Sequence, residues 1–380
     1  MTIGIDIRLI GKKQTGSEGV FFNIVKELAK IDSHNKFKLF TDITDEKILE
    51  KIKKDLEIEN KNNFEIVSLP TTNKFSWNFW TLQRYLRKNP VNVYLTQYIT
   101  PFFVPQKIKI ATIIHDISFN FFPQFIKKSD LFFLKILIPL TLRRADKVLA
   151  VSKFTRYEIG KYYNTDPDKM EWFHNAVSED FLKADISLEK IKEVKEKYNL
   201  PDKFILYVGT LQPRKNIPVL IEAYNMAKDK LPDTKLVIAG GKGHNYDPRI
   251  DETVKKYNLE KDVFLPGFID EEDKAAVMAG ALIFSFPSLY EGFGIPILEA
   301  MSVGVPVIAS GILPHREIAE EAVLFFDPEN SEELSQKIIL LSKDDNLREK
   351  LAKDGKRQVK NFSWDRSTQK VLAVLEKMNR

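Results

Sequence analysis

The sequence predicts an α/β protein built from doubly wound parallel sheets in two domains. Short apolar runs alternate with longer helical patterns along the chain, the order that parallel strands joined by helical crossovers produce. At 380 residues the chain is longer than one hydrophobic core usually supports. Two of the apolar runs lead through polar loops directly into helices, and such loops lie at the carboxyl edge of a doubly wound sheet, where ligands bind.

The strand candidates form two sets. In the first half they are residues 3–7, 37–41, 64–68, 92–96, 109–114 and 147–151, and in the second half 204–208, 235–239, 262–265, 282–286 and 305–309. Residues 183–198, rich in Lys and Glu, predict an exposed helix, and residues 199–202 predict the turn into the second domain. We therefore expect a domain boundary near residue 180.

Composition agrees with an ordinary globular enzyme, with 43% hydrophobic and 29% charged residues. The chain has no cysteine, which excludes disulfides and thiolate metal sites. Its five histidines are scattered, and no His-x-x-x-His or Asp-x-Asp pair provides a compact metal site. We therefore expect no obligatory metal.

Charge and hydropathy bear on where the protein acts. The chain opens on a short strand rather than a signal peptide, and no uncharged apolar stretch reaches the roughly 20 residues that span a bilayer. The net charge is +7 for residues 1–180 and −2 for residues 181–380, so the first half is expected to meet an anionic acceptor or membrane face. We expect a cytoplasmic protein, peripheral on the inner face of the membrane.

The most informative stretch is Glu291 to Glu299, which follows the apolar run 282–287. Pro296 suits a first helical turn and Gly304 the helix end, so Glu299 is expected on a short helix and Glu291 in the loop before it. A loop carboxylate can accept from sugar hydroxyls, and a helix carboxylate from the vicinal diol of a ribose. The alternative is that Glu299 only favours a helix N-terminus and Glu291 is solvated. Backbone N–H groups that would point at an anion there belong to Phe293, Gly294 and Ile295.

A second loop, residues 209–216, follows the apolar run 204–208 and precedes a helical pattern at 217–228. Arg214 and Lys215 therefore lie before a helix N-terminus, the end at which the helix dipole disfavours cations. Their position is explained if a diphosphate lies between them and the helix, because the two cations would stabilise it as a leaving group. A solvated basic loop is the alternative.

Together these residues resemble the retaining glycosyltransferases of family 4, which have the GT-B fold. The resemblance covers nearly the whole chain, and its motifs are highly specific in combination and order. Besides the two loops, they are residues 3–7 with the Gly16 loop, 113–116, 148–152, 174–177, 236–241 and 265–268.

The resemblance implies two Rossmann-like domains facing a cleft, with the closing helix 363–378 crossing back to the first domain. The acceptor domain would comprise residues 1–180 and 363–380, and the nucleotide-sugar domain residues 181–362. Arg214 and Lys215 would neutralise the diphosphate, Glu291 would hold sugar hydroxyls, Glu299 the ribose, and His115 the donor sugar. Further donor contacts would come from Leu211, Phe268 and Ile269 at the base and from the backbone of Phe293, Gly294 and Ile295.

The implied reaction transfers a sugar from a UDP- or GDP-linked donor to a hydroxyl of a glycan or lipid-linked saccharide, as in cell-surface polysaccharide synthesis. Because no carboxylate is clearly placed as a nucleophile, retention is expected by attack on the face of the departing phosphate. No nucleic acid partner is expected. Two rivals are a non-catalytic sugar-nucleotide-binding protein and an NAD-dependent oxidoreductase. A non-catalytic protein would be expected to have lost charges from the site, and all four are present: Arg214, Lys215, Glu291 and Glu299. The lack of a G-x-G-x-x-G fingerprint after the first strand disfavours the oxidoreductase.

Acceptor elements are expected in the basic half. Residues 15–19, including Gly16, precede an amphipathic helix at 20–31 and offer N–H groups to an acceptor. Glu18 and Gly19 stand where relatives often carry a glycine and an arginine, so Glu18 either binds acceptor hydroxyls or only favours the helix N-terminus. The aromatic stretch 75–80 and the apolar stretch 131–142 either pack in the core or face lipid.

Overall fold

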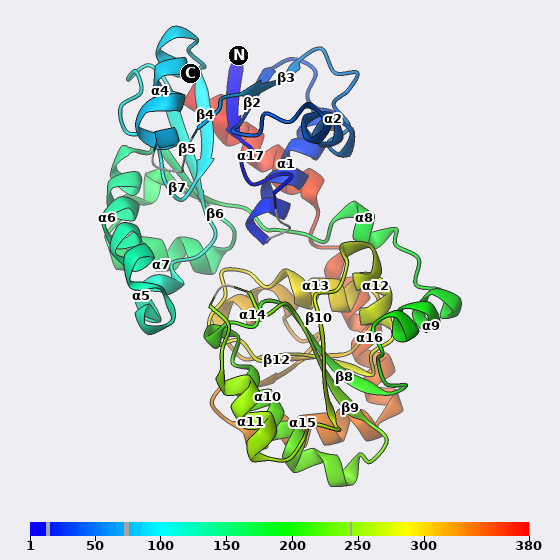
Figure 1. Ribbon diagram of the computed structural model, residues 1–380. Helices are drawn as coiled ribbons and strands as arrows, with labels where there is room; N and C mark the ends of the chain where they lie inside the picture. Colours follow the sequence, from blue (N-terminus) through cyan, green and yellow to red (C-terminus); the bar gives the residue numbers. More distant parts are fainter. Residues whose placement is uncertain (13–15, 72–75, 244, 380) are drawn as a thin grey trace. The chain divides into compact units, whose positions relative to one another are not determined.

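The computed structural model describes residues 1–12, 16–71, 76–243 and 245–379. They form two compact units, each an α/β sandwich around a fully parallel sheet (Figure 1). The first unit comprises residues 1–117, 129–175 and 363–380, and the second comprises residues 118–128 and 176–362. The expected fold class, with two doubly wound parallel sheets, is confirmed.

The first unit contains a seven-stranded sheet in the order β3-β2-β1-β4-β5-β6-β7. Its central strands are almost entirely buried Ile, Val, Leu and Ala, as expected where helices cover both faces of a parallel sheet. The chain builds outward from β1 to β3 and then returns to add β4 on the other side of β1. The parallel strands β1 and β4 pair in the register Ile3 to Val93. The strands are β1 (Thr2–Asp6), β2 (Lys36–Thr41), β3 (Phe64–Ser68), β4 (Val93–Gln97), β5 (Lys109–Ile114), β6 (Lys147–Ala150) and β7 (Met170–Trp172).

Helices of the first unit include the last helix of the chain, α17, which packs against α1 as the fold class implied. Asn35 Nδ2 donates to Glu376 Oε1 at 3.0 Å and ties α17 to the start of β2. The helical elements are α1 (Gly16–Ile31), α2 (Glu46–Asp55), the π-helical turn η1 (Trp77–Thr81), α4 (Leu82–Lys88), α6 (Lys128–Arg144), α7 (Lys153–Tyr163), η3 (Pro167–Lys169) and α17 (Trp364–Met378).

The second unit contains a six-stranded sheet in the order β10-β9-β8-β11-β12-β13. The chain builds outward from β8 to β10 and then returns to β11, so the switch point lies between β8 and β11. Ligands of doubly wound folds bind outside the carboxyl ends of the strands at this position. The strands are β8 (Phe204–Val208), β9 (Lys235–Ala239), β10 (Val263–Gly267), β11 (Ile283–Phe286), β12 (Val307–Ser310) and β13 (Leu324–Phe326).

Helices cover both faces of the second sheet. α10 packs with α11 and α15, whereas α13 packs with α12, α14 and α16 (Figure 1). The helical elements are α5 (Ser118–Phe121), η2 (Pro123–Phe125), α8 (Glu179–Leu182), α9 (Leu188–Lys197), η4 (Pro213–Lys215), α10 (Ile217–Ala227), η5 (Lys228–Lys230), α11 (Arg249–Lys256), α12 (Glu271–Ala279), α13 (Ile295–Ser302), α14 (Leu313–Ala319), α15 (Ser331–Lys343) and α16 (Asp345–Val359).

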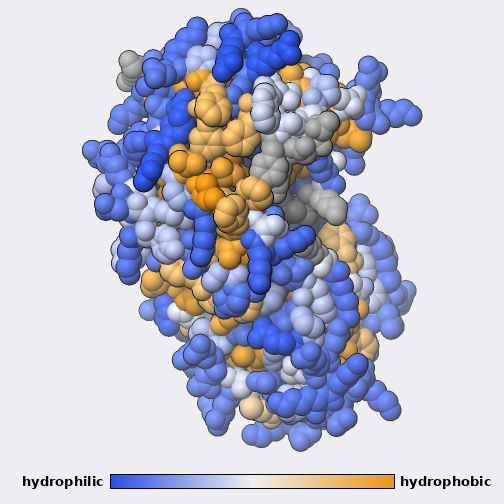
Figure 2. Space-filling model, turned by 60° about the vertical axis from the view of Figure 1, so that its left-hand side comes forward, coloured by the Kyte–Doolittle hydropathy of each residue, from blue (hydrophilic) through white to orange (hydrophobic). Residues whose placement is uncertain are grey.

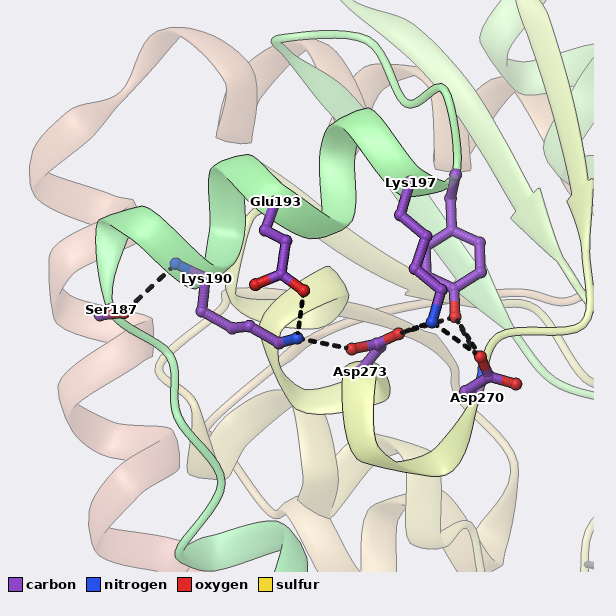
Figure 3. A network of polar contacts seen from close by, with 7 residues as sticks. Ser187, Lys190, Glu193, Lys197, Asp270 and Asp273 are labelled. Atoms are coloured by element: carbon purple, nitrogen blue, oxygen red, sulfur yellow. Dashed lines mark hydrogen bonds and ion pairs between the residues drawn. The ribbon is translucent and has the colours of Figure 1, made fainter.

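A polar network joins α9 to α12 (Figure 3). The carboxylate of Asp273, only 1% exposed, accepts from Lys197 Nζ at 2.6 Å and pairs with Lys190 Nζ at 3.0 Å. The Tyr198 hydroxyl donates to the same carboxylate at 2.8 Å. Burial opposes ionisation, but these three donors lower the pKa of Asp273 to about 2. The network anchors the helix that carries Lys274 into the candidate site.

Two strands of the structure, β7 and β13, were not predicted from the sequence. β7 and β13 are three-residue strands at the edges of their sheets, and each pairs with one neighbour only. Three residues are too few to show a strand periodicity, and their position is set by the β6 and β12 backbones they pair with rather than by a local pattern.

Candidate functional site

The loop between β11 and α13 carries the first candidate carboxylate. As predicted, Glu291 lies in this loop and Glu299 on the short helix α13. Gly294 forms the helix N-cap with φ of 117°, a backbone conformation that an L side chain rarely adopts. Pro296 occupies the first turn of α13, where its missing N–H is not needed. The N–H of Ile297 donates to the carbonyl of Gly294 at 3.0 Å, and the positive end of the α13 dipole favours an anion beside this loop.

The predicted cations lie on η4, the turn between β8 and α10. Arg214 Nη1 donates to Glu291 Oε2 at 2.9 Å and to the carbonyl of Tyr290 at 3.0 Å. The Lys215 ammonium donates to the other carboxylate oxygen, Oε1. The N–H of Leu289 donates to the carbonyl of Arg214 at 2.8 Å, which joins the two loops at the switch point.

Glu291 is the negative centre of this cluster. Its side chain and that of Lys215 are each only 9% exposed. Burial alone would raise the pKa of Glu291, but the charges of Lys215 and Arg214 hold it far below its ordinary value. The cations were predicted to bind a diphosphate and the carboxylate to bind sugar hydroxyls, whereas the structure pairs them with each other.

His315, which was not predicted as a site residue, lies beside Gly294 of this loop. Its Nδ1 is 2.9 Å from the carbonyl of Ser310, which can only accept, so Nδ1 carries the proton. Nε2 is buried and has no hydrogen-bond partner among the described residues. Burial lowers the pKa of His315 to about 4, against the raising effect of Glu291. The available signal was its position shortly after the strand β12.

Glu299 forms a second ion pair within the second unit. Lys274 Nζ of α12 donates to Glu299 Oε1 at 2.8 Å and to Glu271 Oε1 at 2.6 Å. Burial would lower the pKa of Lys274, but the charges of Glu299 and Glu271 raise it above its ordinary value. Lys274 therefore stays charged and fixes one carboxylate oxygen of Glu299, which is 7% exposed.

The residues predicted to border the base follow β8 and β10. Leu211 and Ile269 are buried, whereas Phe268 is 58% exposed. A Cβ on Gly240 would lie 2.1 Å from the carbonyl oxygen of Gly209, so the loops after β8 and β9 approach as closely as backbones allow. Phe293 is buried with its ring against Phe362.

His115 and Gly16 belong to the first unit. His115 follows β5, and its Nε2 is 2.9 Å from Gln97 Oε1. Burial lowers the pKa of His115 to about 4, although Asp116 acts in the opposite direction. Gly16 is the first residue of α1, and the preceding Thr15 lies outside the described residues. Glu18 Oε1 accepts from the N–H of Gly11 at 3.1 Å and so supports the loop after β1.

Two global properties complete the description. Within the described residues, no three His, Asp or Glu side chains gather as a metal-binding group. None of the helices in the described ranges has the length and apolar character needed to cross a bilayer.

Doubly wound units with charged loops at the switch point are typical of proteins that bind anionic ligands at the ends of parallel strands, and sequence comparisons specify the class of this chain. Residues 15–181 match the sequence profile of Glycosyltransferase Family 4, and residues 189–358 match that of Glycosyl transferases group 1. O-antigen chain mannosyltransferase B of Escherichia coli is 33% identical over 277 residues, which cover 71% of this chain and 71% of that protein. The chain therefore belongs to the family 4 glycosyltransferases.

Two further proteins are similar to this chain. The N-acetylgalactosamine-N,N'-diacetylbacillosaminyl-diphospho-undecaprenol 4-alpha-N-acetylgalactosaminyltransferase of Campylobacter jejuni is 32% identical over 60% of this chain and 59% of that enzyme. The Anabaena protein Alr3699/HepE, solved with UDP and glucose, superposes with a TM-score of 0.75 at 17% identity, covering 99% of this chain and 100% of that one. The structural likeness agrees with the GT-B fold, and the chain is a glycosyltransferase.

Proposed function

We propose that the protein is a retaining glycosyltransferase that moves a sugar from a nucleoside diphosphate sugar to a hydroxyl of a glycan or lipid-linked saccharide, in the synthesis of a cell-surface polysaccharide. The observation that carries this proposal is the cluster of Arg214, Glu291 and Lys215 beside the N-terminus of α13. The relatives support the acceptor class, because one is named for O-antigen chains and another for a diphospho-undecaprenol saccharide.

Arg214 and Lys215 are assigned to the donor diphosphate. Negative charge grows on the phosphate as the bond between the sugar and its leaving oxygen breaks, and the buried Lys215 and the partly buried Arg214 would stabilise that charge. The positive end of the α13 dipole adds to the same field. Glu291 accepts from both cations, so the diphosphate would have to displace this carboxylate from them.

Once its cations turn to the phosphates, Glu291 is left to accept hydrogen bonds from hydroxyls of the donor sugar. Glu299 is assigned to the ribose diol, with Lys274 holding its carboxylate in orientation. In the first unit, His115 is assigned to a hydroxyl of the donor sugar. The base would lie against Leu211, Phe268 and Ile269, and either uracil or guanine would satisfy these contacts.

Retention is proposed without a covalent glycosyl intermediate. In the donor complex Glu291 is assigned to hydroxyls of the sugar, and no carboxylate is assigned as a nucleophile at the anomeric carbon. The acceptor hydroxyl instead attacks on the face from which the diphosphate leaves, and its proton passes to the departing phosphate oxygen. The new glycosidic bond forms as the old one breaks, and the configuration at the anomeric carbon is kept.

The remaining assignments concern the acceptor and its location. The backbone at the start of α1, from Gly16, is assigned to acceptor binding. We expect the protein to act on the cytoplasmic face, peripherally on an anionic membrane, and without an obligatory metal.

The proposal is tested by supplying a panel of UDP- and GDP-sugars with and without saccharide acceptors. NMR of the product identifies the anomeric configuration, which we expect to match that of the donor. Activity is expected to survive EDTA. The Lys215→Met variant is expected to lose roughly 100-fold in kcat with a smaller change in KM, because leaving-group charge peaks in the transition state. An inverted product, or binding without turnover for every donor, would contradict the proposal.

A further inference from the structure

One face of the first unit exposes large hydrophobic side chains in an unusual concentration. Trp80 of η1 is 70% exposed, Phe103 after β4 is 61% exposed and Phe132 of α6 is 63% exposed. Figure 2 shows hydrophobic side chains gathered in a band on the side of the molecule where α4 and α6 lie. We name this band the aromatic face, and its exposed members are Trp80, Phe103, Phe132, Phe133, Ile136 and Leu140.

Hydrogen bonds connect the parts of the aromatic face. Arg87 Nη2 of α4 donates to the carbonyl of Phe103 at 3.3 Å. A few residues earlier in the same loop, the N–H of Thr100 donates to Thr141 Oγ1 of α6 at 3.2 Å. The loop after β4 therefore bridges α4 and α6. Beside it lies a groove of about 920 Å³, lined by Phe79, Trp80, Arg84, Tyr85, Arg87 and Phe103 among others.

Helix α6 has one buried and one exposed side, so neither of the two alternatives left open for residues 131–142 describes all of it. One side of the helix is buried, through Leu137, Ile138, Thr141 and Leu142. The opposite side exposes Phe132, Ile136 and Leu140, which follow one another at intervals of four residues. The helix thus packs into the core along one side and presents an apolar stripe along the other.

Positive charge accompanies this apolar surface. Residues 66–115 contain six Lys and Arg and no Asp or Glu. Arg84, Arg87 and Lys88 are exposed beside the groove, and Lys135 and Arg143 are exposed on α6. Asp130, in the first turn of α6, is the acidic residue of that helix. The surface is therefore apolar, aromatic and cationic.

We propose that the aromatic face docks onto the interface of an anionic lipid bilayer. Exposed Trp and Phe rings settle at the boundary between headgroups and acyl chains, and neighbouring Lys and Arg bind lipid phosphates. The stripe on α6 and the rings at the groove would enter this boundary together, with Arg84, Arg87 and Lys88 at the headgroups. The inference rests on the proposed function, because a lipid-linked acceptor is held in such a membrane.

The test measures sedimentation of the full chain with phosphatidylcholine vesicles and with vesicles that also contain phosphatidylglycerol. The double variant Arg84→Gln/Lys88→Gln is expected to lower the partition coefficient about 25-fold, since each cation near an anionic surface contributes about fivefold. Trp80→Ser/Phe103→Ser is expected to lower binding to anionic vesicles and to make the remainder more sensitive to salt. The matched control is Leu188→Ser/Lys192→Gln on α9, which removes an apolar side chain 81% exposed and a cation 80% exposed from the second unit.

Three outcomes would overturn the docking proposal: equal binding to neutral and anionic vesicles, an equal loss in the control variant, or absence of vesicle binding with capture of a soluble glycan by the aromatic face. Binding of nucleoside diphosphate and transfer to a soluble acceptor are measured on the same variants and are expected to be unchanged. Vesicle binding without transfer from any donor would refute the proposed function alone. Transfer without vesicle binding would refute the docking surface alone.

Discussion

Arg214 donates to Glu291 at 2.9 Å across 77 residues of sequence, so one of the two cations proposed to bind phosphate has a buried carboxylate as its counterion. Lys215 completes this pairing from the other side of the carboxylate. Glu291 therefore bonds both cations in the structure. Under the proposed function, donor binding would be an exchange of partners, in which the cations bond the diphosphate and the carboxylate bonds the sugar.

Glu291→Gln is expected to separate these two roles. Removal of the competing charge should leave Arg214 and Lys215 more available, so free nucleoside diphosphate should bind roughly 2- to 10-fold more tightly. Turnover of the intact donor should fall roughly 10- to 100-fold, because the sugar loses a charged acceptor. Calorimetry with nucleoside diphosphate and steady-state kinetics measure the two effects. Weaker diphosphate binding in this variant would refute the exchange of partners.

Glu299→Gln is expected to behave differently, because a ribose contact exists with or without the sugar. The affinities for free nucleoside diphosphate and for the intact donor should both fall, by roughly 10- to 100-fold, and by similar factors. The control is Glu271→Gln, which removes the other carboxylate bonded to Lys274 but lies 46% exposed on α12. If Glu271→Gln weakened nucleotide binding as much as Glu299→Gln, the ribose assignment would fail.

Much of the fold was predictable because the central strands are buried on both faces and leave continuous apolar runs. β3, β5, β8 and β9 were predicted at both ends, and the loops after β8 and β11 were recognised as lying at the carboxyl edge. The edge strands β7 and β13 were not predicted, because pairing with a neighbour rather than local sequence determines them.

The site was predictable in its members but not in its pairings. Strand and helix signals locate Arg214 and Glu291 at neighbouring strand ends, yet nothing local specifies that they contact each other. The same limit applies to Lys274, whose helical pattern gives no indication of Glu299. His315 was not predicted as a site residue, because a lone histidine is usually structural, and its buried, unpartnered Nε2 distinguishes it in the structure.

Gly294→Ala is expected to displace the Glu291 loop. Gly294 has φ of 117°, and a Cβ there would lie 3.2 Å from His315 Cδ2 and from Ile318 Cδ1. The backbone conformation alone costs roughly 1–2 kcal/mol for an L residue, and a shift of about 1 Å at the donor can cost about 100-fold in rate. The loss of turnover, expressed as a change in activation free energy, should therefore exceed the loss in the free energy of unfolding. Gly241→Ala, where a Cβ meets no atom within 4 Å, should leave stability unchanged. Full activity of Gly294→Ala would show that the loop tolerates the displacement.

Asp273→Asn is expected to lower stability at neutral pH and to alter its dependence on acid. The carboxylate of Asp273 holds α9 on α12 through Lys190, Lys197 and Tyr198, as Figure 3 shows for the two lysines. Loss of hydrogen bonds to a charged group costs roughly 1.5–3 kcal/mol in the free energy of unfolding.

The sign of the pH effect follows from the lowered pKa of Asp273, about 2 in the folded protein, against roughly 3.9 when unfolded. A lowered folded pKa contributes stability above the unfolded value and loses it as the pH falls through the folded one. The difference in unfolding free energy between wild type and Asp273→Asn should therefore be constant above about pH 5 and shrink between about pH 4 and 2. Denaturant unfolding at a series of pH values measures this difference. Asp270→Asn is the control, because that side chain bonds Lys197 but is 53% exposed, and its effect should be smaller. A difference for Asp273→Asn that stayed the same down to pH values of about 2 would show that the ionised carboxylate does not hold the two helices together.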